Sequence, residues 1–131
     1  MSQLTRHQID KIRRSLRERE RTLRKEIREG LLRTGEARYK DLAGAVSDAG
    51  DDSVADLLSD VEIAGVDRDV RELRAVQDAL ERMLHGNFGM CSDCAAPIGF
   101  ARLTANPAAV RCHDCEVRHE RAYAHPETRS L

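Results

Sequence analysis

The sequence contains no tryptophan, and aromatic residues make up only 3% of its 131 residues. A compact globular core normally relies on more aromatic side chains. No apolar run approaches the roughly 18 residues that mark a membrane-spanning helix. The first ten residues also lack the apolar core of a signal peptide. We therefore expect a cytoplasmic chain with no membrane partner, and the high share of charged residues, 34%, favours long helices that face solvent.

The four cysteines are the most specific feature of the chain. They form two pairs, Cys91-x2-Cys94 and Cys112-x2-Cys115, with 17 residues between the pairs. Each pair can place two thiolates on one turn, and the intervening loop lets the pairs converge on a tetrahedral ion. Four sulfur ligands suit one structural Zn²⁺ and leave no open position for catalysis. Two disulfides or a redox dithiol are the competing interpretations, and disulfides would require an oxidising compartment.

Charge is distributed unevenly along the chain, although its formal net charge is only −1. Residues 1–40 carry 13 Lys and Arg against 6 Asp and Glu, whereas residues 41–70 carry 1 against 9. The remaining residues balance, with 8 of each sign. A basic face of this kind is most simply a solvated helix surface. Nucleic-acid binding by the basic segment is the alternative, which the absence of interleaved aromatic residues disfavours.

Apolar periodicity predicts an all-α dominated fold. Residues 4–45 and 53–86 each carry an apolar stripe at helical spacing, and Gly30 and Gly35 mark a point where the first helix could break. The two stripes predict a long antiparallel coiled-coil hairpin over residues 1–87, with an acidic tip at 46–53 at the end far from the cysteines. Residues 88–125 then form a four-cysteine zinc-finger domain with a short C-terminal helix, about 113–124. Residues 126–131 are expected to be a disordered tail.

The cysteine-rich segment and its surroundings resemble the DksA/TraR family of bacterial transcription factors. The upstream match rests on the hairpin architecture and on Asp48-Ala49-Gly50-Asp51, where Ser53 replaces an alanine of the family pattern. The zinc-finger match is carried by Phe88-Gly89-Met90-Cys91-Ser92-Asp93-Cys94, Pro97-Ile98-Gly99, Arg102-Leu103, Ala105-Asn106-Pro107 and Cys112-His113-Asp114-Cys115.

The resemblance implies a regulator that binds RNA polymerase directly, as a monomer. Such proteins insert the coiled-coil tip into the secondary channel of the polymerase and alter promoter-complex stability without reading a DNA sequence. By this analogy Asp48, Asp51 and Ser53 are the tip residues that act near the polymerase active centre, and Asp51 is the stronger candidate of the two carboxylates.

Some members of this family use the alarmone ppGpp as a partner at the polymerase interface. Arg68 keeps one basic position of the effector site that the resemblance implies, and it is the candidate residual effector contact. Ala75, Asn106 and Glu116 stand where basic residues are expected, and Glu72 replaces an apolar neighbour. Because phosphate groups are bound by Arg and Lys, we expect this chain to act largely without ppGpp.

Two other classes of function remain as alternatives. A zinc-finger DNA-binding protein would need a basic finger, but residues 91–115 carry only Arg102 and Arg111 against Asp93 and Asp114. An enzyme or redox switch would need a free thiolate, which a closed zinc site does not offer. No glycine-rich phosphate loop is present, and the five histidines are scattered. We therefore predict that the chain is not an enzyme.

Overall fold

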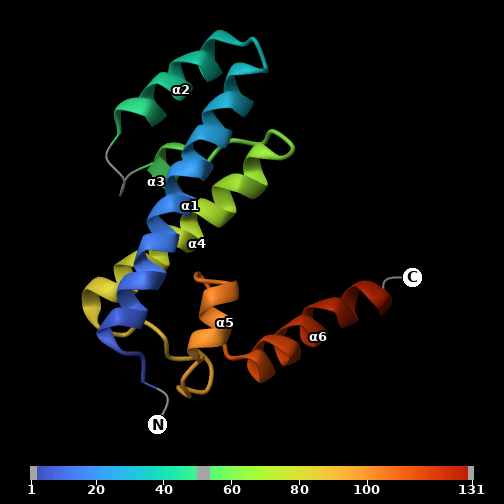
Figure 1. The fold of residues 1–131 in the computed structure, drawn as a ribbon. Coiled ribbons are helices and arrows are strands. Elements are labelled where there is room, and N and C mark those ends of the chain that lie inside the picture. The colour runs from blue at the N-terminus through green and yellow to red at the C-terminus, as the bar shows by residue number, and fades with distance from the viewer. Residues whose placement is uncertain (1–2, 50–53, 130–131) are drawn as a thin grey trace.

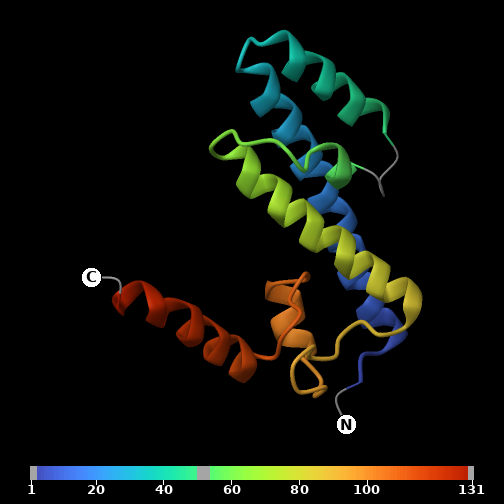
Figure 2. The ribbon, with the colours of Figure 1, turned by 180° about the vertical axis from the view of Figure 1, so that it is seen from behind.

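The structure, a computed structural model, describes residues 3–49 and 54–129, with side chains described to residue 122. The helices of these residues are α1 (Arg6–Leu32), α2 (Ala37–Asp48), α3 (Val54–Leu57), α4 (Val66–His85), α5 (Phe100–Ala105) and α6 (His113–Arg129). Figures 1 and 2 show that α1 and α4 form a long antiparallel pair, which we call the rod, with the cysteine-rich segment at its base. None of the described helices is long and apolar enough to span a membrane.

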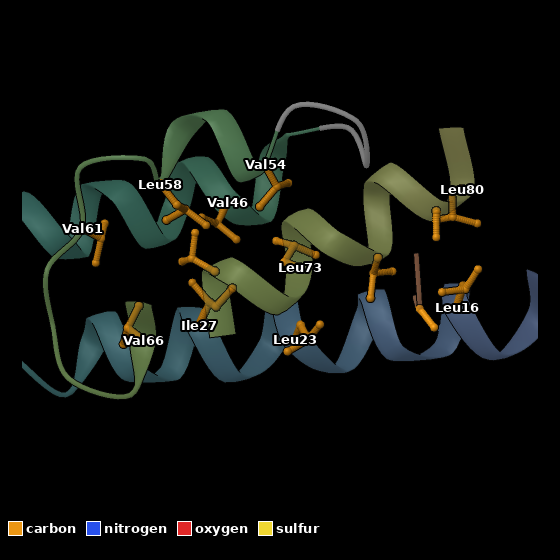
Figure 3. Packing of buried hydrophobic residues seen from close by; sticks show 14 of the residues in the cluster. Leu16, Leu23, Ile27, Val46, Val54, Leu58, Val61, Val66, Leu73 and Leu80 are labelled. Carbon is orange, nitrogen blue, oxygen red and sulfur yellow. The ribbon is translucent and has the colours of Figure 1, made fainter. Parts of the chain in front are cut away.

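The rod is held by the apolar stripe of α1, which packs against α4 over most of its length (Figure 3). Burying these side chains removes apolar surface from water, which is the main stabilising contribution to such a pair of helices. This arrangement confirms the predicted helical hairpin. The fully or nearly fully buried residues at its centre are Ile12, Leu16, Leu23, Ile27 and Leu31 of α1 and Val66, Val70, Leu73, Val76, Ala79 and Leu80 of α4.

Local contacts explain how α1 begins and how closely its other end approaches α4. The Thr5 hydroxyl accepts the Gln8 N–H at 3.1 Å, and the Gln8 side chain accepts the Thr5 N–H at 2.9 Å, which forms a capping box. Near the other end, Gly30 faces α4. A Cβ at this position would lie 2.6 Å from Val66 Cγ2, so Gly30 lets the two backbones approach closely.

The predicted first helix breaks after Leu32, close to the two glycines that allowed a break. The chain then reverses its direction instead of only bending. The chain turns at residues 33–36, where Gly35 has a φ of +74°, and α2 folds back along α1. Arg24 Nη2 of α1 donates to the carbonyl oxygens of Val46 and Ala49 at 2.9 and 2.7 Å. The far end of the rod is therefore formed by the turn at 33–36. Our placement of the acidic segment at that end is therefore wrong for its described residues, 46–49, and residues 50–53 lie outside the described residues.

The second helix is also shorter than predicted. Instead of one helix over 53–86, the structure has the single turn of α3, an irregular segment over 58–65 and then α4. Leu58 and Val61 of the irregular segment are buried against the rod, and Gly65 begins α4 with a φ of +89°. Leu84 belongs to the apolar stripe of residues 53–86, but its side chain is 82% exposed.

One charged side chain lies inside the apolar interface. Glu20 is 2% exposed, and its carboxylate accepts from Arg17 Nη1 at 3.2 Å and from Gln77 Nε2 at 3.4 Å. A buried carboxylate is costly unless it is hydrogen-bonded, so these two donors explain how the interface tolerates it. Glu20, Arg17 and Gln77 together form a polar layer between α1 and α4.

The base of the rod joins the finger through apolar contacts near the N-terminus. Leu4 lies against Gly89, whose φ is +92°, and Leu103 of α5 is completely buried beside them. The last helix, α6, points away from the rod (Figure 2) and extends to Arg129 instead of ending near residue 124. The expected disordered tail of residues 126–131 stays a prediction, and residues 130 and 131 lie outside the described residues.

Candidate metal centre

The first cysteine pair sits on a tight loop that backbone hydrogen bonds hold in place. Cys91 N–H donates to the Ala96 carbonyl at 2.8 Å, and Ala95 N–H donates to the Cys91 carbonyl at 2.9 Å. Ala95 adopts a left-handed backbone with a φ of +64°, which turns the chain back toward Cys91. An isolated antiparallel bridge between Met90 and Pro97 closes the loop. The loop thus brings Cys91 and Cys94 to the same side.

The second cysteine pair lies at the start of α6. Glu116 N–H donates to the Cys112 carbonyl at 2.9 Å, so Cys112 precedes the first turn of the helix and Cys115 lies within that turn. The two pairs are joined directly, because Ser92 N–H donates to the Val110 carbonyl at 2.8 Å. Arg111 adds an ion pair to Asp93, with 3.1 Å between Nε and Oδ2. These contacts bring two segments 17 residues apart in sequence to one place.

The four sulfur atoms have the arrangement that a tetrahedral zinc site requires. The Sγ atoms of Cys91, Cys94, Cys112 and Cys115 all lie within 4.8 Å of one another, and Cys94 and Cys112 are 3.8 Å apart. Zn–S bonds of about 2.3 Å in a tetrahedron place the sulfurs about 3.8 Å apart. Cys91 and Cys115 are buried and Cys94 is exposed. The four cysteines that the spacing predicts as ligands therefore meet at a single site.

The pKa shifts of the clustered thiols show why a bound cation would be stabilising at this site. Burial raises the pKa of Cys91, but backbone N–H groups around its sulfur outweigh this effect and lower the pKa to about 6. For Cys115, Arg118 donates to the sulfur at 3.1 Å and lowers the pKa, yet the neighbouring thiols and burial raise it to about 12. Four thiolates this close repel one another, and a bound divalent cation removes that repulsion.

Asp48, the one described residue among those assigned to the acidic tip, is not part of this centre. Asp48 is the last residue of α2, and its neighbours Val46 and Ala49 bond to Arg24 in the middle region of α1. Asp51 and Ser53 lie outside the described residues. Of the acidic segment, the described residues 46–49 lie beside α1 and not beyond its end.

The positions assigned to an effector site are brought together in part. Glu72, Ala75 and Asn106 line one groove of about 500 Å³ between the rod and the finger, together with Arg19 and Pro107. Arg68 and Glu116 do not line it. Arg19 Nη2 donates to Glu72 Oε1 at 2.7 Å, and this hydrogen bond lowers the pKa of Glu72 despite partial burial. Sequence reasoning missed Arg19, because its partner lies 53 residues away.

Comparison with known proteins agrees with the site. Residues 86–121 match the prokaryotic dksA/traR C4-type zinc finger. Two relatives, both named RNA polymerase-binding transcription factor DksA, come from Buchnera aphidicola subsp. Schizaphis graminum and Caulobacter vibrioides strain NA1000 / CB15N. They are 35% and 36% identical over 60 and 61 residues, which are 46% and 47% of this chain. The aligned segments span only 40% and 43% of the relatives' own lengths.

A solved structure shows the same fold over most of the chain. Transcription factor DksA2 from Pseudomonas aeruginosa aligns with a TM-score of 0.62 and 24% sequence identity. The alignment covers 91% of this chain and 88% of that one. Because the finger type and the clustered sulfurs agree, the four cysteines form a structural zinc site, and both the zinc cofactor and the predicted family resemblance are confirmed.

Proposed function

We propose that this chain, a member of the DksA/TraR family through its zinc finger, binds RNA polymerase and regulates transcription as a monomer. The observation that carries the proposal is the combination of a rod and a finger at its base, an arrangement it shares with the DksA2 structure. The relatives that match the finger are named for RNA polymerase binding. The closed four-sulfur site supports a structural and non-catalytic role for the metal.

The rod is suited to enter a narrow channel. Helix α1 has 27 residues and rises about 1.5 Å per residue, so it is about 40 Å long, and the finger thickens the base from which it extends. We propose that the rod enters the secondary channel of the polymerase while the finger stays outside. A change in promoter-complex stability would follow from contacts inside the channel, with no base sequence read by the finger.

Asp48, Asp51 and Ser53 are proposed to act near the polymerase active centre. In the described conformation Asp48 lies alongside α1, so this role requires α2 to separate from α1 when the polymerase binds. The separation would break the two hydrogen bonds from Arg24 and expose Val46, which is 1% exposed here. Contacts with the polymerase would have to offset this cost, because a partner can shift a conformational equilibrium only by its differential affinity.

Co-purification and transcription in vitro test the proposal together. The tagged full-length chain should retain RNA polymerase from a cell extract and change the lifetime of open promoter complexes made with purified polymerase. The double variant Asp48→Asn/Asp51→Asn should bind polymerase but lose most of the effect, because Asn keeps the shape of Asp and removes only its charge. Failure to retain polymerase would refute the proposal, and an unchanged effect of the double variant would refute the role of the acidic segment alone.

We also propose that the effect on polymerase is largely independent of ppGpp. The groove lined by Glu72, Ala75 and Asn106 has Arg19 as its one cationic lining residue among those described, and this guanidinium is paired with Glu72. A multiply charged phosphate ligand requires donors that are not already paired with a carboxylate. Transcription assays with and without ppGpp, on polymerase lacking its other alarmone site, should give equal results. Clear synergy would overturn this part of the proposal.

A further inference from the structure

The basic side chains of α1 between residues 13 and 28 fall into two groups with different environments. In the first group each guanidinium bonds to a carboxylate or to backbone carbonyl groups: Arg13 to Asp10 at 2.7 Å, Arg19 to Glu72, and Arg24 to the α2 carbonyls. In the second group no carboxylate partner exists among the described residues. This group contains Arg14, Arg21, Lys25 and Arg28, and we call it the basic ridge.

The basic ridge occupies one face of α1. With 3.6 residues per turn, its four members lie within an arc of about 60°, on the side opposite the buried stripe. Arg17 and Arg24 border the ridge toward the core, and Glu18 and Glu29 lie just beyond its other border. No acidic side chain falls on this face between residues 13 and 28. Arg14, Arg21 and Lys25 are exposed, and Arg28 is half-buried with Nη1 3.2 Å from Ser47 Oγ.

The ridge also borders a hollow. Arg21, Arg24, Lys25 and Arg28 line a depression of about 260 Å³ with Val46 and Ser47 of α2. Four cationic side chains around one depression repel one another at neutral pH, and this repulsion is relieved when an anion binds between them. The fold-back of α2 over α1 creates this depression, which a straight helix over 4–45 would not have formed.

We propose that the basic ridge binds the phosphate backbone of duplex nucleic acid without reading its sequence. The ridge runs from Arg14 to Arg28, or about 21 Å along the helix axis, which is enough to reach several phosphates. A protein–protein interface normally has an apolar centre, and no apolar side chain interrupts the ridge. Phosphate binding needs no such centre, because release of counterions supplies its favourable free energy. This function is separate from the proposed binding of polymerase.

Fluorescence anisotropy with the zinc-loaded full chain tests the inference. Labelled duplexes of two unrelated sequences should bind equally well, and log K should fall with log salt at a slope of about −0.9 per neutralised phosphate, or about −3.6 for four. The variant Arg14→Gln/Arg21→Gln/Lys25→Gln should flatten the slope to about −0.9 and weaken binding at least about tenfold. These three side chains are exposed, so the helical circular dichroism should stay unchanged.

The matched control removes the same charge elsewhere. Arg38, Lys40 and Arg71 are exposed and lie outside the ridge, so Arg38→Gln/Lys40→Gln/Arg71→Gln should bind duplexes as the unmodified chain does. Equal losses from both triple variants would overturn the inference, because binding would then follow net charge alone. Polyglutamate of matched charge is the competitor. If it displaced the duplex as well as unlabelled duplex does, the ridge would fit an acidic protein and the inference would be wrong.

Discussion

Two leucines of α4 provide a direct test of how the rod packs. Leu73 and Leu84 both belong to the apolar repeat of the sequence, but Leu73 is 0% exposed against α1 whereas Leu84 is 82% exposed. Truncating a buried leucine to alanine typically costs 2–5 kcal/mol, because apolar contacts are lost and a cavity remains. We expect Leu73→Ala to lower the free energy of unfolding by about 3 kcal/mol, and Leu84→Ala to change it by less than about 0.5 kcal/mol.

The measurements are urea unfolding and thermal unfolding of the zinc-saturated protein, both followed by far-UV circular dichroism. At about 4 °C per kcal/mol, the melting temperature of Leu73→Ala should fall by about 12 °C. The two variants share residue type and helix, so their difference isolates burial. Equal losses from both would refute the described packing of α4. A loss from Leu84→Ala that depended on protein concentration would instead place Leu84 in an interface between copies of the chain.

Three further outcomes are expected. Cys112→Ser removes a zinc ligand, so metal analysis should find little bound zinc and limited proteolysis should cut residues 88–125, whereas a variant with full zinc content would contradict the site. Gly30→Ala places a Cβ 2.6 Å from Val66 Cγ2 and should cost about 1–3 kcal/mol in urea unfolding, part of which Val66→Ala should restore. Glu72→Gln should cost at most about 1 kcal/mol at pH 7, since the Arg19–Glu72 pair is partly exposed. Because Arg19 lowers the pKa of Glu72, this contribution is present above the unfolded pKa and is lost as the pH falls through the folded value, so an equal cost at pH 7 and pH 2 would argue against the ion pair.

The metal ligands could be predicted from sequence because their constraint is local. Each Cys-x2-Cys pair needs only one turn of backbone, and four soft ligands define the ion that they bind. The apolar stripe of α1 could be predicted for the same reason, since helical periodicity is a property of neighbouring residues. These two features together predicted the hairpin and the finger at its base.

The fold-back of α2 could not be predicted in this way. Ala43 and Val46 are buried in α2, and their spacing is compatible with either a straight helix or one that returns along α1. Periodicity records which face is apolar but not which surface covers it. The decision depends on the backbone at Gly35, where the left-handed conformation reverses the chain. The same ambiguity explains why the acidic segment was placed at the end of the rod.

Leu84 shows a second limit of apolar periodicity as a guide to burial. Along α4 the buried face moves around the helix, from Val70 and Leu73 near the far end to Val76 and Ala79 near the base. A straight helix drifts relative to a strict seven-residue repeat, and the finger covers part of the helix surface at the base, where Val76 borders the groove with Pro107. A seven-residue repeat counted from the start of α4 therefore places Leu84 on the buried side, although its side chain is exposed.

Which charged side chains are paired and which remain available depends even more on elements that are distant in sequence. In the sequence the basic residues of 1–40 surround a helix and are most simply a solvated face. In the structure Arg19 pairs with a carboxylate 53 residues away, and Arg24 bonds to carbonyl groups 22 and 25 residues away. Between residues 13 and 28, the cations without a carboxylate or backbone carbonyl partner among the described residues are those of the basic ridge, which lie on one face of α1. A surface that looks evenly basic in sequence is thus divided by folding into side chains that stabilise the rod and side chains that are available to a partner.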